Sequence, residues 1–270
     1  MKTYYYMAGL PRSGSTVISA LLNQNPKIYS GPPSPVLHAM FLLEQGLFED
    51  EFFLANPKMD QVKKIISNVI VEFYNDVENS IIIDKNRAWT NKISYIQKYL
   101  NEKPKIICPV RDITEILSSI ITLIKNHPYQ EGHSKINFID QSLIKLDIPI
   151  TDDNRCDYIM EYGGFVGQSL SGINEVLKNK YSDFIHFVEY KDLLQDPQKT
   201  LNKIYDFLEQ DYYEHDFENI KSTEYLNDFE IYGIKDLHRV RTRLECVSKN
   251  PEDVLSNYIL EKYQNMNIWR

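Results

Sequence analysis

The chain has 270 residues, of which 43% are hydrophobic and 25% charged, a composition typical of a globular protein with a sizeable core. Its 30 Lys and Arg residues against 38 Asp and Glu residues give a net charge of −8, which argues against broad attraction to nucleic acid or to an anionic membrane. A bound anion must therefore be held locally. We expect one domain, residues 1–270, with excursions at about 30–57 and 125–155.

The chain carries no sign of metal binding, export or membrane insertion. Its cysteines form no CxxC pair and no histidine stands at zinc-ligand spacing from them, so we expect reduced thiols at Cys108, Cys156 and Cys246 and no metal. A turn begins already at Gly9, which leaves no room for a signal peptide, and no run of 18 apolar residues follows. We therefore expect a soluble cytoplasmic protein without a membrane span.

Short apolar runs alternate with helical patterns along the chain. The predicted strands are Thr3 to Met7, Ser80 to Lys85, Lys105 to Val110 and Phe184 to Tyr190. The predicted helices are Ser15 to Leu22, Gln61 to Tyr74, Lys92 to Leu100, Thr114 to Ile124, Pro197 to Leu208 and Val254 to Tyr263. This alternation predicts an α/β fold of three layers, P-loop-like, with a central, mostly parallel sheet flanked by helices.

The two excursions fit the alternation poorly. Residues 30–57 contain four prolines and many aromatic residues, and residues 125–155 contain two histidines and several polar turns. Ligands of open α/β sheets bind beyond the carboxyl ends of the strands, where such connections gather. Both segments are therefore candidate walls of a substrate site.

The stretch GLPRSGST, Gly9 to Thr16, lies between the first predicted strand and the first predicted helix. It has the G-x-x-x-x-G spacing of a phosphate-binding loop, but Ser15 stands in place of the lysine and Arg12 supplies the cation. Backbone amides, the helix N-terminus and three hydroxyl donors converge there. These donors belong to Ser13, Ser15 and Thr16. The stretch favours a phosphate site over an ordinary turn capped by Ser13.

A second candidate anion site follows the third predicted strand, in CPVRDITEILSSI. Arg111 stands at the end of the strand, and Ser119 lies eight residues later, about two turns along the next helix. Alone, this arrangement is commonplace in structural roles. Together with the first motif, it predicts a second phosphate contact.

The segment PRSGSTVISALLNQNP, residues 11–26, resembles the 5′-phosphate-binding segment of sulfotransferases that use 3′-phosphoadenosine-5′-phosphosulfate (PAPS). The resemblance is closest to the tyrosylprotein and bacterial branches, where Pro-Arg-Ser-Gly-Thr-Thr opens the fold. It implies that residues 13–16, including Gly14, hold the 5′-phosphate and that Arg12 lies near the sulfuryl group. It also implies that Arg111 and Ser119 hold the 3′-phosphate, with Ser118 as the alternative.

Two later segments resemble the same family more weakly. The resemblance of VEYKDLLQDPQKTLNKIYDFL implies that Tyr190 lies beside the adenine, although the segment also fits a plain strand, loop and helix. LHRVRTRLECVSKNPEDVL resembles a segment that closes over the nucleotide, which implies cofactor roles for Arg241, Ser248 and Lys249. A solvated basic loop is the alternative for these three residues.

Transfer of a sulfuryl group builds negative charge on the leaving phosphate oxygen, so cations are needed there. The resemblance implies that Arg12 and Lys85 supply them; an ion pair with Asp84 is the alternative for Lys85. The acidic base of tyrosylprotein sulfotransferases aligns with Pro33, which cannot accept a proton. His38 is the nearest titratable replacement. The further candidates are Glu44, His127 and His133.

The predicted function is a sulfotransferase that moves a sulfuryl group from PAPS to an acceptor hydroxyl and releases the 3′-phosphorylated nucleotide PAP. The acceptor stays open among small molecules, glycans, lipids and peptides, and the missing acid weakens the case for tyrosine in a protein. A rival is a P-loop kinase with Asp84 as metal ligand, which the absence of the motif lysine disfavours. A non-catalytic nucleotide-binding relic is the other alternative.

Overall fold

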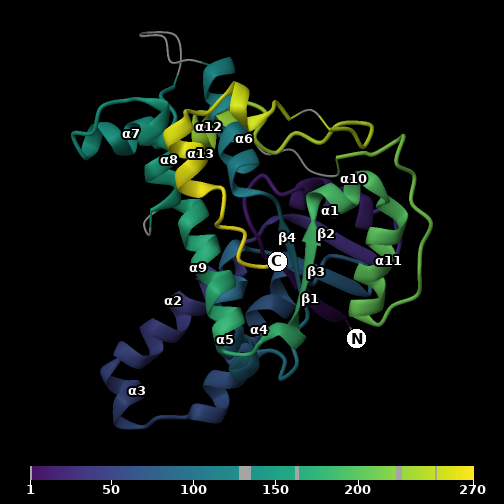
Figure 1. Cartoon of the computed structure of the whole chain (residues 1–270). Helices are drawn as coiled ribbons and strands as arrows, with labels where there is room; N and C mark the ends of the chain where they lie inside the picture. The colour runs from purple at the N-terminus through teal and green to yellow at the C-terminus, as the bar shows by residue number, and fades with distance from the viewer. Residues whose placement is uncertain (1, 128–134, 162–163, 223–226, 247) are drawn as a thin grey trace.

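The computed structural model describes residues 2–127, 135–161, 164–222, 227–246 and 248–270 (Figure 1). Five parallel strands form one sheet in the order β2-β3-β1-β4-β5. The strands are β1 (Thr3–Met7), β2 (Ile28–Pro33), β3 (Ile81–Lys85), β4 (Ile106–Val110) and β5 (Ile185–Glu189). The four strands predicted from the sequence are confirmed, and the α/β class with a parallel central sheet is as expected.

The sequence pattern missed β2, which lies at one edge of the sheet. Its sequence, IYSGPP, ends in two prolines, and a proline cannot donate to a sheet ladder. An edge strand tolerates this because one side of its backbone has no partner strand. Its register with β3 shifts between Ser30 and Pro33, where the ladder is irregular.

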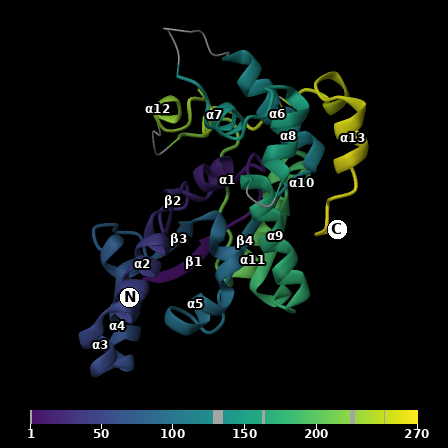
Figure 2. The same cartoon turned by 90° about the vertical axis from the view of Figure 1, so that its left-hand side faces the viewer.

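Helices cover both faces of the sheet and make the three layers that were predicted (Figures 1 and 2). One face packs on α1 (Ser15–Leu22) and α11 (Pro197–Leu208). The other face packs on α4 (Met59–Phe73), α5 (Ile93–Tyr99), α6 (Ile113–Asn126) and α9 (Phe165–Lys178). The apolar strand residues therefore point alternately into two cores, as the continuous apolar runs required.

The remaining elements connect and extend these layers. They are α2 (Val36–Glu49), α3 (Glu51–Ala55), α7 (Phe138–Lys145), α8 (Asp152–Met160), α10 (Tyr190–Gln195), α12 (Asp228–Tyr232), α13 (Asn257–Tyr263) and three 3₁₀ turns, Arg87–Lys92, Ser182–Phe184 and Pro251–Asp253. In the described part of the chain, no helix is both long enough and apolar enough to cross a membrane. All three cysteines are free, as expected.

Both excursions contain more regular structure than the sequence indicated. Residues 30–57 hold the end of β2 and all of α2 and α3, and residues 125–155 hold α7 and the start of α8. The predicted helix at Val254 to Tyr263 begins later than expected. The Ser256 hydroxyl caps it by accepting a hydrogen bond from the Ile259 amide at 3.3 Å, so α13 starts at Asn257.

Candidate active site

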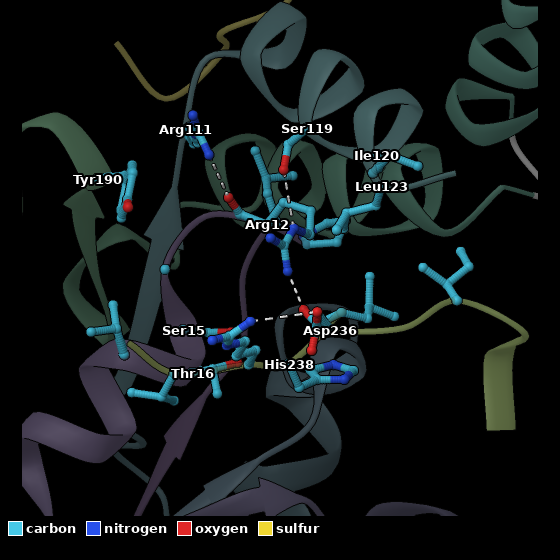
Figure 3. A pocket seen from close by; sticks show the side chains of 18 of the residues that line it. Arg12, Ser15, Thr16, Arg111, Ser119, Ile120, Leu123, Tyr190, Asp236 and His238 are labelled. Carbon is cyan, nitrogen blue, oxygen red and sulfur yellow. Dashed lines mark hydrogen bonds and ion pairs between the residues drawn. The ribbon is translucent and has the colours of Figure 1, made fainter. Parts of the chain in front are cut away.

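A cavity of about 690 Å³ opens at the carboxyl edge of the sheet, where β1, β3, β4 and β5 end. The loop after β1, Arg111 after β4 and Tyr190 after β5 line it (Figure 3). Lys85 at the end of β3 lines it as well. Parallel strands bring these positions to one edge although they are far apart in the sequence. Residues between 236 and 249 form a further wall.

The loop after β1 has two residues in the left-handed region, Arg12 at φ 59° and Gly14 at φ 89°. A Cβ at Gly14 would lie 2.7 Å from Cδ2 of Tyr190, so both the backbone angle and the close approach require glycine. This turn directs α1 to begin at Ser15, and Ser15 and Thr16 line the cavity as predicted.

Ser13 departs from its predicted role as a hydroxyl donor. Its side chain is fully buried, and its Oγ donates to the carbonyl oxygens of Leu10 and, at 2.9 Å, Pro109. Ser13 therefore fastens the loop to the end of β4, and its hydroxyl does not face the cavity. The predicted 5′-phosphate site consequently depends on Ser15, Thr16 and the amides of the loop.

Arg111 connects three of the predicted cofactor residues. Its Nη1 donates to the carbonyl oxygen of Arg12 at 3.2 Å, its Nη2 donates to the Ser248 hydroxyl, and its guanidinium lies 4.8 Å from the centroid of the Tyr190 ring. Its Nε donates to Glu115 at 2.7 Å. Arg111 is only 6% exposed, so these contacts fix its position at the cavity wall.

Arg12 projects from its loop into the space between Ser119 on α6 and the segment that carries Asp236 and His238 (Figure 3). Its Nε donates to the Ser119 hydroxyl at 3.2 Å, and its Nη1 donates to the carbonyl oxygen of Leu237. Burial and the nearby charge of Arg111 lower the pKa of Arg12. Because the positive charges of Arg12 and Arg111 repel each other, an anion bound between the two guanidinium groups would be favourable.

Of the two neighbouring serines on α6, Ser119 lines the cavity. Ser118 is 1% exposed, and its hydroxyl donates to the carbonyl oxygen of Lys249 at 3.5 Å. Lys249 and Arg241 also line the cavity, and Arg241 pairs with Glu245 at 2.9 Å. The structure thus brings the predicted C-terminal cofactor residues to the same cavity as the two phosphate motifs.

Asp84 and Lys85 are neighbours at the end of β3, but their side chains lie in different environments. The Asp84 carboxylate is fully buried and accepts hydrogen bonds from three neutral donors, Ser34, Tyr74 at 2.7 Å and the Trp89 indole at 2.7 Å. Burial raises the pKa of Asp84. Asp84 does not line the cavity, so its position gives no support to the kinase alternative, in which Asp84 would bind a metal ion. Lys85, in contrast, lines the cavity and is 7% exposed.

The sequence analysis did not single out His238. Its Nδ1 lies 2.6 Å from Oδ1 of Asp228, and its backbone amide donates to Oδ2 of the same carboxylate at 2.7 Å. A pocket of about 30 Å³ beside the main cavity is lined by His238 together with Lys85 and Thr16, which places these three close together. Burial lowers the pKa of His238, and the Asp228 carboxylate opposes that shift.

Of the candidate bases that the structure describes, His38 and Glu44 lie outside the cavity and His127 lines it. His38 is exposed on α2 and is not among the residues that line the cavity. Glu44 accepts hydrogen bonds from Lys98 at 2.8 Å and from Tyr99, outside the cavity. His127 lines the cavity at the end of α6. His133 lies outside the described residues.

The segment 30–57, predicted as a wall of the substrate site, contributes little to the cavity. Within the described part of the chain, Pro33 is its sole residue that lines the cavity.

The charge of the cavity is opposite to that of the whole chain. Among its described lining residues, eight are Arg or Lys and two are Asp or Glu, in a chain of net charge −8. The basic residues are Arg12, Lys85, Arg87, Arg111, Arg239, Arg241, Arg243 and Lys249, and the acidic ones are Asp236 and Glu245. The cavity therefore carries a local excess of positive charge, which suits a polyanion.

Comparisons with known proteins identify the family of the chain and similar folds. A family model described as "Sulfotransferase domain" matches residues 3–265. The sulfotransferase domain from the curacin biosynthetic pathway superposes with a TM-score of 0.51 at 13% identity, covering 99% of this chain and 92% of the other. Mouse sulfotransferase SULT7A1, solved in complex with PAP, gives a TM-score of 0.51 at 13% identity and coverages of 98% and 82%. Sequence comparison with curated proteins gives no match.

Proposed function

The chain belongs to the sulfotransferase family, whose members move a sulfuryl group from PAPS to an acceptor, and from this premise we propose how its cavity binds PAPS and performs the transfer. The observation that carries the proposal is the meeting of two anion-binding motifs in one cationic cavity. The loop at 9–16 and Arg111 approach each other through the hydrogen bond from Arg111 to the Arg12 carbonyl. One ligand with two separate phosphates matches this pair of motifs.

The 5′-phosphate binds at the N-terminus of α1, where Ser15, Thr16 and the loop amides act as donors and the helix dipole favours negative charge. The 3′-phosphate binds between Arg111, Ser119 and Ser248. Tyr190 then lies beside the nucleoside, because its ring packs against both Gly14 and the Arg111 guanidinium. Arg241 and Lys249 lie along the remaining wall of the nucleotide site.

Arg12 and Lys85 stabilise the charge that develops during transfer. The acceptor oxygen forms a bond to sulfur while the bond between sulfur and the bridging phosphate oxygen breaks, and the electron pair of that bond leaves with PAP. Both cations lie next to the 5′-phosphate loop, so they meet the growing charge on the bridging oxygen. These two fixed cations supply the needed electrostatic stabilisation, and the proposed reaction therefore requires no metal.

His238 replaces His38 as the proposed base. Its Nδ1 proton is donated to Asp228, which leaves the Nε2 lone pair to accept the proton of the acceptor hydroxyl. Because it lies beside Lys85 and Thr16, we assign it to the sulfuryl end of the site rather than to the adenine end. Its lowered pKa keeps the ring neutral at pH 7, as a base must be.

Calorimetric titration with PAP and with Mg-ATP tests the nucleotide assignment. We expect PAP to bind in the presence of a chelator and Mg-ATP to bind at least about tenfold more weakly, the scale of one lost charge-assisted contact. The 3′-phosphate of PAP reaches Arg111, and Mg-ATP offers nothing at that position. Tighter binding of Mg-ATP would contradict the proposal.

A further inference from the structure

Arg87 lines the cavity but has no part in the proposed transfer. It begins the 3₁₀ turn two residues after Lys85, its side chain is accessible, and its guanidinium lies 5.5 Å from the ring centroid of Phe165. Among the residues that the structure describes, no carboxylate lies within ion-pair distance of it. Arg87 therefore presents a positive charge to the cavity without an acidic partner from the described chain.

The two carboxylates of the cavity already have partners. Asp236 lies 3.6 Å from Arg239, and Glu245 lies 2.9 Å from Arg241. Neither is left to neutralise Arg87. The side chain of Arg87 keeps contact with solvent, but the surrounding cavity walls reduce its hydration and lower the pKa of Arg87, while the Tyr232 phenol opposes that shift. A partly desolvated cation of this kind favours an anionic ligand.

A series of aromatic rings joins Arg87 to the proposed base. The ring of Phe165 lies 5.4 Å from that of Phe138, which lies 6.0 Å from Tyr232, and Tyr232 lies 5.7 Å from His238, all between ring centroids. Each of these residues lines the cavity. We call Phe165, Phe138 and Tyr232 the aromatic wall. It offers an apolar surface that neither a phosphate nor a sulfuryl group would use.

From this arrangement we infer that the acceptor is a hydroxyl compound with an apolar or aromatic body and an anionic group, and that Arg87 binds the anionic group. The body packs on the aromatic wall, and the hydroxyl reaches His238. This inference rests on the proposed function, because His238 defines where the hydroxyl lies. Arg87 is then a specificity-determining residue, and the excess of cations in the cavity serves both the donor and the acceptor.

Binding of a matched pair of probes tests the inference. The probes are 6-hydroxy-2-naphthoate and its uncharged amide, 6-hydroxy-2-naphthamide, titrated against the full chain both free and saturated with PAP, with naphthalene fluorescence as readout. We expect the carboxylate to bind roughly ten- to a hundredfold more tightly than the amide, the scale of a charge-assisted contact. In Arg87→Gln this preference falls to near one, and Arg87→Lys restores part of it.

Lys92→Gln is the matched control, because it removes one positive charge from the same 3₁₀ turn at a residue that packs on Phe41 outside the cavity. It should keep the preference for the carboxylate. Equal binding of both probes, binding of neither, or the same loss in both variants would overturn the inference. The PAP titration separates this outcome from failure of the proposed function, since PAP binding does not involve Arg87.

Discussion

Arg111→Ala should weaken PAP binding far more than it weakens binding of AMP, which differs from PAP only in lacking the 3′-phosphate. A charge-assisted hydrogen bond contributes about 1.5–3 kcal/mol, so the preference for PAP over AMP should fall roughly ten- to 150-fold. Ser119→Ala removes a neutral donor to the same phosphate, and its effect should have the same direction and be smaller, about 0.5–1.5 kcal/mol.

The comparison of two ligands separates recognition from folding. Arg111 also holds the Arg12 carbonyl and pairs with Glu115, so some general loss is expected for both ligands. Glu115 is 44% exposed but Arg111 only 6%, so the loss of this partly buried i,i+4 pair should affect both ligands alike and appear as a change in stability. Calorimetry with both nucleotides, together with thermal unfolding of each variant, gives the answer. Equal losses for PAP and AMP would show that Arg111 only supports the fold, and the reasoning would be refuted.

Three further predictions concern the loop, the leaving group and the base. Lys85→Ala should lower single-turnover transfer roughly 10²- to 10³-fold while PAP affinity in calorimetry changes little, and Lys85→Arg should recover little of it; a normal rate would contradict the assigned role. The acid limb of kcat/KM should lie below the ordinary histidine pKa of 6.5, because burial lowers the pKa of His238 and the neutral ring is the base. Asp228→Asn should move that limb to still lower pH, since the carboxylate raises the pKa of His238; an unchanged limb would exclude His238. Gly14→Ala should weaken PAP binding and lower the melting temperature, and adding Tyr190→Ala should restore only part of the loss, because it relieves the 2.7 Å approach and not the left-handed φ of 89°.

The sequence predicts the central strands and the turn before α1 well because their signals are local. Apolar runs define β1, β3, β4 and β5, and the G-x-x-x-x-G spacing defines the turn before α1. Strand β2 is not predicted because it contains Ser, Gly and Pro, which are unusual in a strand. A sheet edge tolerates these residues, but the sequence does not reveal that β2 lies at the edge. The position of a strand in the sheet depends on the whole topology, so a local sequence pattern does not predict it.

The proposed base, His238, illustrates the same limit. His38 is close to the phosphate motif in sequence, yet α2 leaves it exposed outside the cavity. His238 is more than 200 residues from Arg12, and only the fold brings its segment across the cavity, where Arg12 donates to the Leu237 carbonyl. A sequence signal existed in Asp228, ten residues before His238, but the pairing of the two depends on the turn between them.

Ser13 shows a different failure, since its motif was recognised and its side-chain role was not. The motif fixes the backbone of the loop, but the direction of each hydroxyl depends on neighbours from β4. The Pro109 carbonyl accepts a hydrogen bond from the Ser13 hydroxyl, whereas Ser15 and Thr16 line the cavity. Contacts between neighbouring strands decide such details.

Transfer of radiolabelled sulfate from PAPS tests the account most directly. The full chain is incubated with ³⁵S-labelled PAPS, a chelator and 6-hydroxy-2-naphthoate beside a panel of other hydroxyl compounds. The labelled acceptor is counted by its radioactivity, and the released PAP, which carries no sulfur, is quantified separately by its ultraviolet absorbance after chromatography. The account predicts labelled acceptor and PAP in equal amounts, with both abolished in a Lys85→Ala, His238→Gln double variant. Tight PAP binding with no labelled product from any acceptor would contradict it and identify a nucleotide-binding protein without transferase activity.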